Sequence, residues 1–104
     1  MSTPRPDDPT PAGAATDEPS PAQIANAVST IPQVADLSGG RLGGVGTYLP
    51  GRRVTGVVIR GEDVEVHVVG RYGVPVAEIA AAVRQAVQPY AGDRTVHVVI
   101  EDLA

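Results

Sequence analysis

The sequence predicts an α+β fold: a single small domain with the order helix, strand meander, helix, strand. Two stretches carry apolar residues at helical spacing, and several others alternate between β-branched and polar residues, as strands do. The 104 residues are enough for one domain and not for two. We therefore expect a mixed sheet of about three or four strands, with two helices packed on one face.

Residues 1–19 are expected to form a disordered, Pro-rich acidic tail, and residues 20–104 the folded domain. The tail holds five of the ten prolines and no large apolar residue after Met1, so it has little surface to bury. It carries four acidic residues and one Arg, while residues 20–104 carry eight acidic residues and seven Arg. Neither part has the basic excess of a nucleic-acid binder. No apolar run is long enough to insert into a bilayer.

The first element of the domain is a helix that begins after Ser20. Ser20 is a good N-cap, and Pro21 suits the first helical position. Apolar residues then return at helical spacing until Pro32, namely Ile24, Val28 and Ile31. The glycine-rich residues 37–44 are expected to be a flexible loop.

A strand meander follows the loop. Pro50 and Gly51 favour a type II turn, and residues 61–63 a three-residue hairpin loop. The strands are expected at residues 45–49, 53–60 and 64–70.

The last two elements are a second helix and a final strand. Pro75 opens the helix, and Gly92 with Asp93 marks its end. Its apolar stripe consists of Val76, Ile79, Val83 and Val87. Residues 95–103 alternate as a strand, and the long connection before them permits a crossover.

Alternation along the strands divides their side chains between two faces of the sheet. Val64, Val66 and Val68 are expected to face the helices, which leaves the opposite face without a cover of its own. Three valines among charged residues on that face favour contact with a second copy or another protein. The predicted interaction residues are Val58, Arg60, Glu65, His67, Val69, His97, Val99 and Glu101.

The stretch Gly70-Arg71-Tyr72-Gly73 has the GxxG spacing of KH domains, which clamp nucleic-acid backbone. A KH loop joins two helices, whereas this stretch follows a strand. The domain is not basic, and its three Tyr are too few for a base-stacking platform. The favoured interpretation is a structural turn with Tyr72 packed on the end of the core. A KH-like RNA-binding loop stays open as the alternative.

No catalytic, cofactor or metal site is predicted. The chain has no cysteine, and its serines lie in no nucleophile motif. His67 and His97, with Glu65 and Glu101 on the same strand faces, have the ligand types of a zinc site. Their spacing matches no metal motif, so a solvated strand face is the preferred interpretation.

The residues 56–87, GVVIRGEDVEVHVVGRYGVPVAEIAAAVRQAV, resemble the alkaline shock protein 23 family of bacterial envelope stress response proteins. PQVADLSGG before them and VHVVIEDL after them extend the resemblance over residues 21–103, with the short, Arg-rich actinobacterial members as the nearest type.

The resemblance implies a non-enzymatic, cytoplasmic protein of cell-envelope homeostasis that acts as an interaction or scaffold module. It implies self-association, or retention at the cytoplasmic side of the membrane by a membrane-anchored relative of the same family. It brings no catalytic residue, cofactor or metal, and nucleic acid is not an expected partner.

Overall fold

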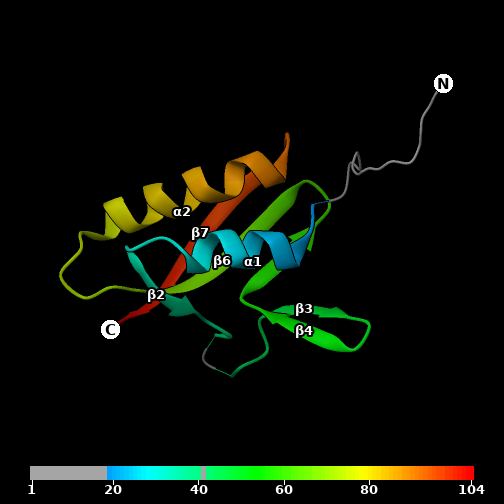
Figure 1. Ribbon diagram of the computed structural model, residues 1–104, viewed down its shortest axis with the longest axis horizontal. Helices are drawn as coiled ribbons and strands as arrows, with labels where there is room; N and C mark the ends of the chain where they lie inside the picture. Colours follow the sequence, from blue (N-terminus) through cyan, green and yellow to red (C-terminus); the bar gives the residue numbers. More distant parts are fainter. Residues whose placement is uncertain (1–18, 41) are drawn as a thin grey trace.

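Two helices, α1 (Pro21–Ser29) and α2 (Val76–Ala91), lie on the same face of a four-stranded sheet (Figure 1). The computed structural model describes residues 19–40 and 42–104. The α+β prediction is confirmed. The expected disordered tail lies outside the described residues except for Pro19, which is buried. The strands of the sheet are β2 (Val34–Leu37), β5 (Val57–Arg60), β6 (Asp63–Gly70) and β7 (Thr95–Leu103).

β6 is the central strand. β7 runs parallel to it along one edge, because α2 carries the chain back across the sheet between them. The other edge of β6 is shared by two antiparallel strands. β5 pairs with its first half, where Val57 lies opposite Val66, and β2 pairs with its second half, where Leu37 lies opposite Val68.

The remaining strands, β3 (Gly46–Leu49) and β4 (Arg52–Thr55), form a separate two-stranded sheet around the predicted turn at Pro50 and Gly51. The predicted single strand 53–60 is wrong, since it breaks at Gly56 into β4 and β5. β2, which was not predicted as a strand, already occupies the edge of β6 beyond Val66, so β4 has to turn away from the sheet.

Gly56 permits β4 to lie away from the main sheet. Its φ is 84°, and a Cβ there would lie 2.8 Å from the carbonyl oxygen of His67. The next turn also differs from the prediction. Arg60 pairs directly with Asp63, so the hairpin between β5 and β6 has a two-residue loop rather than three.

The ends of the helices largely follow the sequence. The backbone N–H of Gln23 donates to Ser20 Oγ at 3.3 Å, and Pro21 is the first residue of α1. α2 starts after Pro75 and ends before Gly92, as expected.

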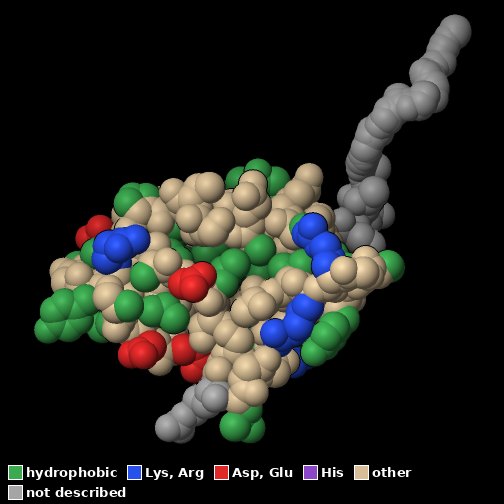
Figure 2. All heavy atoms as spheres, turned by 60° about the horizontal axis from the view of Figure 1, so that its bottom comes forward, with side chains coloured by type: hydrophobic (Ala, Val, Ile, Leu, Met, Phe, Trp, Pro, Cys, Tyr) green, Lys and Arg blue, Asp and Glu red, His purple; other side chains and the backbone are tan. Residues whose placement is uncertain are grey.

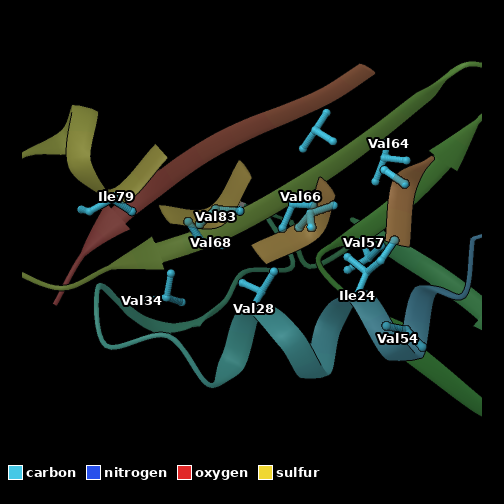
Figure 3. Packing of buried hydrophobic residues seen from close by; sticks show 13 residues of the cluster. Ile24, Val28, Val34, Val54, Val57, Val64, Val66, Val68, Ile79 and Val83 are labelled. Atoms are coloured by element: carbon cyan, nitrogen blue, oxygen red, sulfur yellow. The ribbon is translucent and has the colours of Figure 1, made fainter. Parts of the chain in front are cut away.

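The core lies between the sheet and the helices and contains no Phe or Trp (Figure 3). Burial of each Val or Ile side chain contributes about 1.5–3 kcal/mol to folding. The largest fully buried side chains come from both layers and are Ile24, Val28, Val57, Val64, Val66, Val68, Ile79, Val83 and Val87.

A β-bulge interrupts β7 near its end. Ile100 pairs with Val68, but the next residue of β6, Val69, pairs with Asp102, so Glu101 is an extra residue in β7. Simple alternation along β7 therefore fails after Glu101. Asp102 joins Val69 on the face away from the helices, and Leu103 lies opposite Gly70.

Candidate interaction face

The sheet face turned away from the helices, here called the outer face, carries all eight predicted interaction residues. Val64, Val66 and Val68 are fully buried on the helix side, which confirms the assignment of the two faces. The register places the predicted residues in neighbouring rows across the sheet, with Val58 opposite Glu65 and Glu65 beside His97. His67 lies beside Val99 in the next row.

Four of the eight residues form a chain of polar contacts across three strands. Arg60 Nη1 on β5 lies 2.7 Å from Glu65 Oε2 on β6. The other oxygen of Glu65 lies 3.1 Å from His67 Nε2, and His67 Nδ1 lies 2.8 Å from Glu101 Oε2 on β7. The His67 side chain is only 11% exposed, so its polar atoms depend on these contacts.

His97 takes part in a different pair. Its Nε2 lies 2.8 Å from Asp63 Oδ1, and both side chains are about half exposed. Both ring nitrogens of His67 already face carboxylates on opposite sides of the ring, so the two histidines do not converge. Within residues 19–40 and 42–104, no group of three His, Asp or Glu side chains is arranged to hold a metal ion.

The apolar part of the outer face consists of the three predicted valines. Val58 and Val69 are half-buried, while Val99 is 37% exposed. Their chain positions place them on three different rows and strands, so the apolar area is spread between the polar residues rather than gathered at one point.

The outer face has a partial cover, contrary to the prediction that it has none. A Cβ on Gly40 would lie 2.8 Å from a Val45 methyl and 3.9 Å from Glu101 Oε2, so this segment lies against the face. Arg53 helps to hold it, since its Nη2 donates to the carbonyl oxygens of Gly43 and Val45 at 2.7 and 3.0 Å. The cover ends at a depression of about 410 Å³ lined by Ser38, Gly40, Val69, Glu101 and Asp102.

Two residues of this face were missed by the sequence analysis. Asp63 was assigned to a loop but is the first residue of β6 and pairs with His97. Asp102 reaches the outer face only because of the bulge at Glu101. A predicted two-residue loop between β5 and β6 would have placed Asp63 in the strand, whereas no sequence pattern marks the bulge.

The Gly70–Gly73 stretch is a turn whose Arg is held by the chain's own backbone. Arg71 Nε donates to the Pro32 carbonyl oxygen at 2.9 Å, and Nη2 donates to Val34 O at 3.4 Å. Gly73 has a φ of 95°, as a structural turn requires. The expected packing of Tyr72 on the core is wrong, because its side chain is 78% exposed.

A second hollow of about 400 Å³ lies between α1, β2 and β4. Figure 2 brings this side of the molecule forward, with hydrophobic side chains between separate acidic and basic groups. Its apolar lining comes from Ala22, Ala25, Leu37 and Val54, and its charged lining comes from Asp36, Arg52 and Arg53. Two Arg and one Asp give the lining of this hollow a small excess of positive charge.

The described part of the chain has no helix with the length and apolar character required to cross a membrane. No protein-family model, curated protein or solved structure matches the sequence or the fold.

Proposed function

We propose that the protein is a non-enzymatic interaction or scaffold module that binds a protein partner through its outer face. The observation that carries the proposal is the combination of partly exposed valines with a fixed chain of polar contacts. The three valines of the outer face offer apolar area, while Glu65, His67 and Glu101 are already held in one arrangement. Side chains that are ordered before binding lose little entropy on association.

The resemblance to the alkaline shock protein 23 family supports a setting for this module. We place it in the envelope stress response, in the cytoplasm and close to the membrane through a partner. In this proposal the partner is a membrane-anchored relative or a second copy, and the module itself does not insert into the bilayer.

The KH-like alternative has less support. Its basic residue, Arg71, donates hydrogen bonds to the carbonyl oxygens of Pro32 and Val34, which engage two of its guanidinium nitrogens within the domain. The loop joins β6 to α2 rather than two helices.

The test compares the full-length chain with its Val58→Glu/Val99→Glu variant in the native cell. After crosslinking, captured membrane proteins and copies of the chain are identified and quantified. The added charges are expected to reduce capture roughly tenfold, because they are unpaired in a desolvated contact. Ala81→Glu/Gln88→Glu, at exposed positions of α2, is the matched control and should capture as much as the wild type.

Far-UV circular dichroism checks that both variants are folded. Undiminished capture by the outer-face variant would contradict the proposal. RNA binding in a filter assay, with a steep loss of affinity as salt rises, would favour the KH-like alternative instead.

A further inference from the structure

We infer that the outer face accepts a basic protein segment in which Lys or Arg alternates with apolar residues. This inference rests on the proposed function and specifies the partner for the same face. Three observations lead to it: the sign of the charge on the face, the depression beside the β7 bulge, and the spacing of the valines.

Acidic groups dominate the outer face. Among the residues that the structure describes, one guanidinium, that of Arg60, and two imidazoles accompany them. The net charge of the face is therefore negative whether the two imidazoles are neutral or charged. The carboxylates that β6 and β7 place on this face are those of Asp63, Glu65, Glu101 and Asp102.

The β-bulge places two of these carboxylates next to each other. Glu101 is the extra residue of β7, and Asp102 follows it on the same face, opposite Val69. A regular strand would direct consecutive side chains to opposite faces. The bulge therefore doubles the negative charge at this end of the sheet.

The depression beside the bulge suits a cationic side chain. It has a volume of about 410 Å³, with Val69 in its lining and the carboxylates of Glu101 and Asp102 at its side. A Lys or Arg stem packs on apolar surface while its charged group reaches polar partners. Within the described chain, Glu101 Oε1 and Asp102 Oδ2 accept no hydrogen bond, so both are available to such a group.

The negative charge of the outer face also argues against binding of a second copy, the chain's own tail, nucleic acid or an anionic membrane at this face. Two copies stacked through this face would bring carboxylates against carboxylates, which costs affinity. Residues 1–19 carry four acidic residues and one Arg, so the chain's own tail is repelled as well. Nucleic acid and anionic lipid surfaces carry the same sign as the face.

The valines define the rest of the partner. Val58, Val69 and Val99 lie between the charged residues on separate strands. An extended segment presents alternate side chains to one surface. A segment that carries apolar side chains near the valines and a basic one at Glu101 and Asp102 fits this pattern and gains charge-assisted hydrogen bonds.

Two synthetic peptides serve as probes, one alternating Val with Lys and one alternating Val with Glu. Binding to the full-length chain is measured by fluorescence anisotropy, and ¹H–¹⁵N spectra locate the site. We expect the Lys peptide alone to bind and to shift the amides of Val58, Val69 and Val99. Glu101→Gln/Asp102→Asn should weaken it roughly tenfold, and added salt should weaken it further.

Glu78→Gln/Asp93→Asn is the matched control, because it removes the same charge at exposed positions outside the outer face. It should change the affinity less than about twofold. Equal weakening in both variants would overturn the inference, since binding would then follow net charge alone. Failure of the Lys peptide to bind, or equal binding of the Glu peptide, would overturn it too.

Sedimentation velocity of the wild type tests the second copy as occupant. A dimer that Val58→Glu/Val99→Glu abolishes would overturn the inference but not the proposed function. Capture from the native cell also distinguishes failure of the inference from failure of the proposed function. Partners lost with Val58→Glu/Val99→Glu but retained with Glu101→Gln/Asp102→Asn contradict only the inference. Partners retained with both contradict the proposed function.

Discussion

Gly70 ends β6 at a position where any side chain would collide with α2. A Cβ on Gly70 would lie 2.5 Å from Ile79 Cδ1 and 3.0 Å from Leu103 Cδ2. Gly73, three residues later, has open space around it but a φ of 95°. The two glycines of one short motif are thus required for different reasons, the first for close packing and the second for backbone conformation.

Gly70→Ala is expected to lower the free energy of unfolding by about 1–3 kcal/mol, because the added methyl overfills the contact with Ile79. Urea denaturation measures the change. Ile79→Val removes the clashing methyl and by itself costs about 0.5–1.5 kcal/mol. The double variant should therefore be more stable than the sum of the two losses predicts. Strict additivity would show that the contact is not the cause.

The two histidine pairs of the outer face offer an internal comparison of burial. The side chains of His67 and Glu101 are 11% and 25% exposed, whereas those of His97 and Asp63 are 50% and 52% exposed. We expect a double-mutant cycle to Ala to give a coupling energy of about 1 kcal/mol or more for the first pair. The second pair should give less than about 0.5 kcal/mol.

Both cycles are measured by urea denaturation in the same buffer. Equal coupling energies would mean that burial does not strengthen the contact between His67 and Glu101. A larger value for His97 and Asp63 would contradict the expectation that the less exposed pair is the more strongly coupled one.

Among the elements, the break between β4 and β5 depends on a single residue. Gly56→Ala is expected to cost about 2 kcal/mol or more, since it combines a strained φ of 84° with a Cβ 2.8 Å from His67 O. Gly51→Ala is the control, because Gly51 has a φ of 79° and no atom within 4 Å of its Cβ position. It should cost about 1 kcal/mol.

Thermal or urea unfolding of the two variants gives the comparison. The difference between them reports the collision of the added methyl with β6 and with the end of β2. If the two losses were equal, β4 could leave the sheet without the close approach at Gly56, and the crowding by β2 would not be the reason for the break.

The elements that the sequence predicted are those whose own pattern is sufficient. Both helices and β7, predicted at residues 95–103, follow from apolar spacing and from capping or turn residues. β2 has four residues and no distinctive pattern, and it becomes a strand only because the edge of β6 is open to it. The break between β4 and β5 at Gly56 is a consequence of β2 pairing, so the local sequence did not predict it either.

On the outer face, too, some features follow from the local sequence pattern and others depend on how the strands assemble. Alternation placed all eight predicted residues correctly, because a buried inner face fixes the register of a strand. The contacts of His67 with Glu65 and Glu101 depend on how three strands align, and Asp102 depends on the bulge. Tyr72 was misplaced because the sequence does not tell whether an aromatic residue in a turn points inward or outward.

At the scale of the whole molecule, charge and apolar surface are distributed unevenly around one small core. The helices cover the inner face, and the outer face keeps acidic residues, a partly exposed Val99 and an incomplete cover. A fold built in this way leaves a face for recognition without weakening its core, because none of the eight predicted residues belongs to the buried apolar cluster.

The separation of β3 and β4 from the main sheet has a consequence for amide hydrogen exchange. The hairpin pairs only with itself, whereas β6 is bonded on both edges by β2, β5 and β7. Local opening should therefore release the amide protons of Thr47 and Val54 without unfolding the domain, and those of Val66 and Val68 only with it. Mild denaturant should accelerate exchange at the second pair and leave the first nearly unchanged; exchange of all four at one rate would show that the hairpin and the sheet open together.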